Sequence, residues 1–219
     1  MASEVDISNM ALDLLGQQPI SSMSQTTGNG PLLTRTYYQQ RDALLRETHW
    51  TFARSEIALT LLNNNIWQNW EYAYQYPTDC LKIQYLMNPN LSPSVSGTGY
   101  PWGPMTWEMY QRDYPHEVTD QLDSNNNATG QKAILSNMDN AYLVYTKAIT
   151  DTALFPATFI DALVLRIAKT ICHRLLPNSP ILNDLKGEYE KASAVAKRDA
   201  SNESVEWANR PSSIEQYRR

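Results

Sequence analysis

The sequence predicts an α+β protein, with helices at both ends of the chain and an antiparallel β region inserted between them. Apolar residues recur at helical spacing before residue 50 and again after residue 155. Between these stretches, short aromatic or aliphatic runs are bounded by Pro, Gly, Asn or Asp, as strands are. The periodicity ends near residue 202. We therefore expect a bundle of about four helices from the N- and C-terminal segments, the inserted β region and an extended C-terminal tail.

Two helices are expected before residue 50. The first covers about residues 4–15, with Ser3 and Asp6 as a capping pair and Gly16 as its stop. After a polar loop, Pro31 is well placed in the first turn of the second helix, because its fixed φ suits that position and its missing N–H costs nothing there.

The inserted region is expected to contain strands at 71–76, 81–87, 106–112, 132–136 and 141–147. A Pro- and Gly-rich loop at 88–104 follows the second strand, and 123–130 has the composition of a hairpin tip. Three tyrosines alternate along the first strand and are expected to cover one of its faces: Tyr72, Tyr74 and Tyr76.

Two further helices are expected after the β region. Pro156 suits the first turn of a helix that has a broad apolar face, as a central helix has, and Pro177 ends that helix. Ser179 and Pro180 begin the last helix in the same way. The chain then divides into N-terminal helices at 1–50, the β-rich insertion at 51–149, C-terminal helices at 150–202 that pack on the first pair, and a docking tail at 203–219.

The composition favours contact surfaces over nucleic-acid binding. The net charge of −5 and the pI near 5.2 argue against a protein that grips DNA through its phosphates, but they suit a surface that DNA slides past. The chain contains 13 Tyr and 6 Trp but only 3 Phe, so most of its aromatic side chains carry a polar group. Aromatic side chains of this kind are enriched at interfaces. The two cysteines, Cys80 and Cys172, are expected to be buried free thiols.

The sequence gives little support for catalysis, for a metal or for a cofactor. The three histidines lie in separate segments without metal-ligand spacing. Cys172 and His173 are neighbours on a helix, which points them about 100° apart. Carboxylate pairs such as Asp120 and Asp123 could serve a glycosidase, but any chain with 23 acidic residues contains such pairs. We therefore expect a protein that is not an enzyme.

Neither a secretory leader nor a membrane span is expected. Asp6 and Asp13 interrupt the apolar positions at the N-terminus. The most apolar window, at 155–176, contains acidic and basic residues. We expect a chain that is soluble and intracellular when made.

An ordered series of motifs resembles the tail tubular protein A family, the head-to-tail adaptors of short-tailed bacteriophages. The series is Ala-Leu-Asp-Leu-Leu-Gly-Gln-Gln-Pro-Ile at 11–20, Arg-Asp-Ala-Leu-Leu…His-Trp-Thr-Phe-Ala-Arg at 41–54, Tyr-Ala-Tyr-Gln-Tyr-Pro-Thr-Asp-Cys-Leu at 72–81, Tyr-Leu-Val-Tyr at 142–145, Phe155…Ala162…Ala168, and Leu182…Tyr189…Ala192. The likeness extends from the first helix to about residue 202. No single motif is specific, but the Tyr-Pro-Thr-Asp-Cys-Leu turn and the ordered series together are fairly specific.

The resemblance implies a structural virion protein located at the head–tail junction, and in the host cytoplasm before assembly. Such proteins form a dodecameric ring beneath the portal, extend the DNA channel used in genome ejection and carry the tail nozzle. The implied partners are the portal protein, a tail tubular protein B-like nozzle and further copies of the chain, with tail fibres as an additional candidate. Double-stranded DNA would pass through the lumen without sequence-specific binding.

By that analogy, the helical part and the tail face the portal, and the β region builds the ring and its tail-side surface. The residues assigned to portal docking are Trp207, Arg210, Tyr217, Arg218 and Arg219. Tyr100 and Trp102 are assigned to the nozzle or to a neighbouring subunit. These residue types are enriched at interface hot spots.

Several alternatives stay open at the level of sequence. We expect a packing role within the fold for Trp50, Trp67 and Trp70. For Tyr100 and Trp102, packing and contact with a partner are equally compatible with the sequence. The tail is either disordered or folds onto a partner. The aromatic residues of the β region could also serve a glycan-binding or glycan-cleaving virion protein, and the chain could be a different ring protein that completes the head or the tail.

Overall fold

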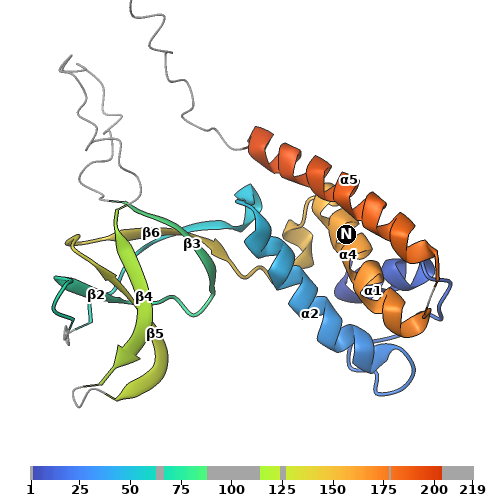
Figure 1. Cartoon of the computed structure of the whole chain (residues 1–219), viewed down its shortest axis with the longest axis horizontal. Coiled ribbons are helices and arrows are strands. Elements are labelled where there is room, and N and C mark those ends of the chain that lie inside the picture. The colour runs from blue at the N-terminus through green and yellow to red at the C-terminus, as the bar shows by residue number, and fades with distance from the viewer. Residues whose placement is uncertain (1, 63–66, 88–113, 124–126, 178, 204–219) are drawn as a thin grey trace, which may run out of the picture. The chain divides into compact units, whose positions relative to one another are not determined.

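The protein divides into two compact units, seen in a computed structural model that describes residues 2–62, 67–87, 114–123, 127–177 and 179–203 (Figure 1). The first unit combines Met1–Ala53 with Ile149–Arg219 and is called the helical unit. The second, Arg54–Ala148, is called the β unit. The sequence had placed these boundaries after residues 50 and 149.

The helical unit is built around one buried helix, α4. Its α-helices are α1 (Glu4–Asp13), α2 (Gly30–Glu47), α4 (Ala157–Leu175) and α5 (Ile181–Glu203), and its 3₁₀ turns are η1 (Thr51–Ala53) and η3 (Thr152–Leu154). Helix α4 contacts α1, α2 and α5, so the N- and C-terminal helices pack together as predicted (Figure 1). The described residues therefore confirm the predicted α+β class, including its four helices.

The helix ends follow the capping signals in the sequence. Ser3 Oγ accepts the Asp6 N–H at 3.2 Å and the Asp6 carboxylate accepts the Ser3 N–H at 2.8 Å, so the predicted capping pair forms. Helix α1 ends at Asp13, two residues earlier than predicted, and Gly16 then adopts a φ of +62°, which disfavours residues with a side chain. Pro31 lies in the first turn of α2, whereas Pro156 precedes α4 as its N-cap.

All three phenylalanines of the chain pack with Trp50 in one aromatic cluster: Trp50, Phe52, Phe155 and Phe159. The Phe159 ring lies 5.0 Å from both Trp50 and Phe52, between centroids, in edge-to-face geometry. Trp50 is 2% exposed, and its ring N–H donates to the Leu44 carbonyl at 3.0 Å. The cluster joins the segment after α2 to the start of α4.

The described residues of the β unit form two three-stranded antiparallel sheets. One sheet has the order β1 (Arg54–Ala58), β6 (Tyr142–Lys147), β3 (Cys80–Met87), and the other has the order β2 (Tyr72–Gln75), β5 (Ala128–Ser136), β4 (His116–Leu122). Both contribute to one core, made of Tyr74, Leu86, Ile134, Met138, Ala141, Leu143 and Tyr145. The sequence had suggested a single antiparallel layer, which is a simpler arrangement than the one observed.

The segment after β1 links the two sheets. Leu59 N–H donates to the Ala141 carbonyl at 2.9 Å, next to β6, whereas Leu62 N–H donates to the Ala73 carbonyl of β2 at 2.8 Å. Within four residues the chain therefore moves from pairing with one sheet to pairing with the other. This continuity explains why the two sheets enclose a common core.

Two strands were missed by the sequence analysis. In the part of the chain that the structure describes, strand β1 lies at a sheet edge and most of its side chains are exposed, so its sequence lacks an apolar alternation. Strand β4 is also an edge strand among the described residues and is largely polar. The expected strand at 106–112 lies outside the described residues.

The predicted hairpin is present, but its tip is shorter than expected. Asp123 N–H donates to the Asn127 carbonyl at 2.9 Å, and β5 already begins at Ala128. The pairing of β4 with β5 shifts after Asp120, and opposite this shift Gly130 adopts a φ of +76°. The polar first half of β5 therefore forms strand where the composition predicted turn.

A hydrogen bond between distant segments fixes the turn that joins β2 to β3. The Cys80 N–H donates to the Pro77 carbonyl at 3.1 Å, and the Tyr145 hydroxyl of β6 donates to the Asp79 carboxylate at 3.0 Å. Burial raises the pKa of the Tyr145 hydroxyl, and the hydrogen bond to Asp79 adds to the effect, whereas a bond from Ser55 opposes it. Tyr145 thus stays protonated and able to donate.

Phe159→Ala should destabilise the helical unit by about 3–5 kcal/mol, because it removes the ring that contacts the other three members of the aromatic cluster. Leu154→Ala is the matched control, since Leu154 is 53% exposed, and should cost less than about 0.5 kcal/mol. Urea unfolding followed by circular dichroism at 222 nm measures both. Equal midpoints for the two variants would contradict the role assigned to the cluster.

Tyr145→Phe should destabilise the β unit by about 1 kcal/mol, because it removes the bond to Asp79 and leaves the ring in place. Tyr142→Phe, in the same strand, is the control. Amide hydrogen exchange of the peptides that contain β3 and β6 should be faster in the first variant than in the second. Unchanged exchange in both would show that the turn does not depend on this bond.

Candidate interaction surface

The residues that the sequence assigned to partner contacts lie outside the described residues. They are Trp207, Arg210, Tyr217, Arg218 and Arg219 of the tail and Tyr100 and Trp102 of the 88–104 loop. Their assignments stay predictions, as does the role of the tail.

The aromatic residues that the sequence assigned to packing are placed by the structure. Trp50 is buried in the aromatic cluster, which confirms its assignment. Trp70 is partly buried in the β unit, where its ring N–H donates to the Glu117 carboxylate at 3.0 Å. Tyr72, Tyr74 and Tyr76 all pack against the β core, so they share one face as predicted. These side chains serve the fold.

The two acids of the candidate carboxylate pair, Asp120 and Asp123, have different local settings in the β unit. Asp123 accepts the Asn127 N–H at 2.9 Å and thereby closes the hairpin tip. Asp120 pairs across the strands with Lys132, in an open hollow of about 360 Å³ that Val118 and Thr119 also line. The described residues that line this hollow include no aromatic side chain. Each acid therefore has a local structural setting of its own.

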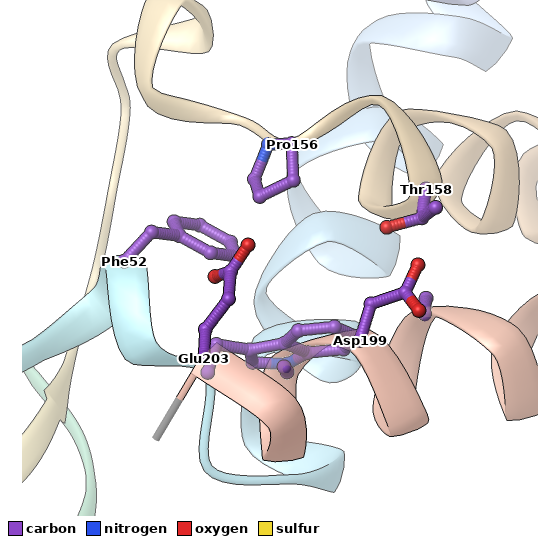
Figure 2. A pocket seen from close by; sticks show the side chains of 8 residues that line it. Phe52, Pro156, Thr158, Asp199 and Glu203 are labelled. Atoms are coloured by element: carbon purple, nitrogen blue, oxygen red, sulfur yellow. The ribbon is translucent and has the colours of Figure 1, made fainter. Parts of the chain in front are cut away.

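A second hollow, in the helical unit, combines aromatic rings with two carboxylates (Figure 2). We call it the carboxylate notch, and the residues that line it are Trp50, Phe52, Pro156, Thr158, Asp199 and Glu203, with two alanines of α5. Figure 2 shows both carboxylate groups reaching up from α5, Glu203 near Phe52 and Asp199 toward Thr158. The enclosed volume is only about 10 Å³, so the notch holds no small-molecule substrate.

The electrostatics of the notch are unfavourable to the isolated helix. Asp199 and Glu203 are four residues apart and so lie on the same face, where like charges repel. Both lie in the last turns of α5 that the structure describes. Asp199 has a contact of 3.9 Å to the exposed Arg198, and Glu203 has no ion pair among the described residues. The notch is thus a site of excess negative charge.

Two contacts hold α5 in position for the notch. The Thr51 hydroxyl of η1 donates to the Ala200 carbonyl of α5 at 3.1 Å, between the two carboxylates in sequence. The aromatic cluster then fixes η1 itself, because Phe52 packs on Phe155 and Phe159. The floor of the notch is therefore part of the core of the helical unit.

A polar network anchors the same helix farther from its end. Arg166 of α4 donates to Glu47 at the end of α2 and, at 2.6 Å, to the Tyr189 hydroxyl of α5. Lys197 of α5 lies 3.1 Å from the second Glu47 oxygen, and Arg166 Nε also donates to Gln40 at 2.8 Å. We call this the Glu47 network. It connects α2, α4 and α5 through one carboxylate.

The protonation of Glu47 is set by its partners. Burial by itself would raise the pKa of the Glu47 carboxyl, but hydrogen bonds and charges from Arg166 and Lys197 outweigh burial and lower the pKa below its ordinary value of 4.5. The carboxylate therefore stays ionised into mildly acidic conditions. Because the folded-state pKa is depressed, the stabilisation is complete above pH 4.5 and disappears as the pH falls through the folded-state pKa.

Neither the notch nor the Glu47 network was found by the sequence analysis. The spacing of Asp199 and Glu203 was visible, but the partners of the notch come from residues 50–52 and 156–158. The sequence analysis considered Arg166 only as one of the charged residues in the apolar window at 155–176. Of the two cysteines, Cys172 is buried as predicted, whereas Cys80 is half-buried.

Among residues 2–62, 67–87, 114–123, 127–177 and 179–203, no three His, Cys, Asp or Glu side chains gather in a way that could hold a metal ion. Within the same ranges, none of the helices has the length and apolar character that crossing a membrane requires.

No protein-family model matches the chain, and no curated protein matches its sequence.

Glu47→Gln should destabilise the helical unit by about 1–3 kcal/mol at pH 7, because Arg166 keeps its position and loses its charged partner. The difference between the variant and the parent protein should shrink as the pH is lowered below 4.5, where the parent's Glu47 carboxylate becomes protonated. Urea unfolding at several pH values measures this, with the exposed Glu188→Gln as control. A difference that does not change with pH would exclude the Glu47 charge as its cause.

Proposed function

We propose that this chain is a head-to-tail adaptor of a short-tailed bacteriophage, a structural virion protein that forms a dodecameric ring between the portal and the tail nozzle. In this role it extends the channel through which DNA leaves the head. Its proposed partners are the portal protein, the nozzle protein and neighbouring copies of itself, with tail fibres as an additional candidate.

The observation that carries the proposal is the ordered motif series, whose members contact each other in pairs. In the β unit, the Asp79 turn of the 72–81 motif accepts a hydrogen bond from Tyr145 of the 142–145 motif. In the helical unit, Phe52 of the 41–54 motif packs on Phe155, the first residue of the next motif. Motifs that are distant in sequence therefore form common structural joints, which supports reading them as one inherited pattern.

The chemistry of the chain agrees with this role. A net charge of −5 suits a channel wall, because tight phosphate contacts would hinder moving DNA. A closed ring needs two different complementary faces on each subunit, and a surplus of Tyr and Trp can supply contacts while leaving the free chain soluble. We expect the chain to stay monomeric until the portal nucleates the ring.

Native mass spectrometry of the protein mixed with the portal ring of its own virus tests the proposal. We expect a monomer in isolation and twelve added copies per portal ring, as the family resemblance implies. We expect removal of residues 203–219 to abolish portal binding and to leave the circular dichroism spectrum of the core unchanged.

Three results would contradict parts of the proposal. Absence of binding by the full chain would separate it from the portal, and quenching of tryptophan fluorescence by oligosaccharides would then favour a glycan-directed virion protein. Binding in another copy number would favour a different head- or tail-completion ring. Full binding by the truncated chain would show that the tail is not the docking element.

A further inference from the structure

Lys169 of α4 lies beside the Glu47 network and has no acidic partner of its own among the described residues. Its Nζ lies 3.9 Å from the centroid of the Tyr189 ring, and the Arg166 guanidinium lies 5.7 Å from the same centroid. The nearby Glu47 carboxylate is already paired with Arg166 and Lys197. The ring therefore holds the Lys169 amine in place without neutralising its charge.

The surroundings of this amine disfavour its charged form. Burial lowers the pKa of the Lys169 amine below its ordinary value of 10.5. The positive charges of Arg166 on α4 and Lys186 on α5 lower this pKa further. The carboxylates of Glu47 and Glu190 oppose the shift without outweighing these effects. More of the Lys169 side chain is thus present as the neutral amine than in a lysine of ordinary pKa, and the neutral amine is the nucleophilic form.

The same group of cations would attract an anionic reagent. Lys169 is half-buried, and Lys186, whose charge acts on it, is exposed on α5. Together with Arg166 they concentrate positive charge at one place on a chain whose net charge is −5, and such a concentration raises the local density of small anions. An acyl phosphate combines negative charge with an activated carbonyl carbon, so it is the class of reagent that this setting favours.

We propose that Lys169 is a modification site, at which anionic acyl donors such as acyl phosphates transfer their acyl group to the amine. The amine nitrogen forms a bond to the carbonyl carbon of the donor, and the bond between that carbon and the phosphate oxygen breaks. Inorganic phosphate leaves with the electron pair of that bond and takes up the proton that the nitrogen releases. The product is a neutral amide, so the modification removes both the charge of Lys169 and its cationic contact with the Tyr189 ring.

Acetyl phosphate tests the proposal when it is added to the full chain and acetylation of each lysine is followed by mass spectrometry of proteolytic peptides. We expect the initial rate at Lys169 to exceed the rate at Lys191, an exposed lysine of α5, by at least about threefold near neutral pH. The rate at Lys169 should also level off at a lower pH than the rate at Lys191, because the neutral amine of Lys169 forms at lower pH.

Two matched variants test the part played by the neighbouring charge. Lys186→Gln removes an exposed cation that acts on Lys169, and Lys191→Gln removes an exposed cation elsewhere on the same helix. We expect the first variant to lower the Lys169 rate by about twofold or more and the second to leave it unchanged. N-acetoxysuccinimide is a neutral acyl donor, so Lys186→Gln should affect its reaction with Lys169 less than it affects the reaction of acetyl phosphate.

Three outcomes would overturn the proposal. The first is a Lys169 rate with acetyl phosphate that is no higher than the Lys191 rate. The second is an equal Lys169 rate in the Lys186→Gln and Lys191→Gln variants, because the neighbouring cation would then have no part in the reaction. The third is a preference for Lys169 that appears only with the neutral donor, which would exclude anionic donors as the reagents. The adaptor role is tested separately, by portal binding.

Discussion

The aromatic cluster of Trp50 and the three phenylalanines is the contact on which the arrangement of the helical unit depends. It joins the end of the N-terminal segment to the beginning of α4, two parts of the chain separated by the whole β unit. The cluster also fixes η1, whose Thr51 hydroxyl donates to the Ala200 carbonyl of α5. An insertion of this length is tolerated because both of its ends connect to a buried, rigid cluster.

One residue of the aromatic cluster, Phe52, belongs both to the core and to the protein surface. Phe52 contributes to the core through Phe155 and Phe159 and also lines the carboxylate notch with its remaining exposed surface. The acids of the helical unit differ in their ion pairs. Glu47 is paired with Arg166 and Lys197. Among the described residues, Asp199 has only a 3.9 Å contact to Arg198, and Glu203 has no ion pair. The acids of the helical unit therefore differ in setting, because Glu47 joins three helices through its ion pairs and Asp199 and Glu203 lie at the surface of α5.

The helices were the most predictable elements, because their signals are local. The Ser3–Asp6 cap, Pro31 and the apolar face of α4 all appeared where the periodicity placed them. Strands β1 and β4 were missed, because an exposed edge strand has no apolar alternation and is defined by the partner beside it. The candidate site was missed for a related reason, since its aromatic and acidic members come from three separate segments.

The sequence by itself determined the α+β class, the insertion of a β region between two pairs of helices, the Ser3–Asp6 cap of α1 and the place of Pro31 in the first turn of α2. These features depend on residues within one or two turns of each other, so local propensity and periodicity are sufficient to specify them. Only the tertiary structure decided that two sheets share one core, that Arg166 joins Glu47 to Tyr189, and that Phe52 lies beside Glu203. Those pairings are fixed by side-chain packing between segments that are distant in the sequence, and no local sequence pattern specifies such packing.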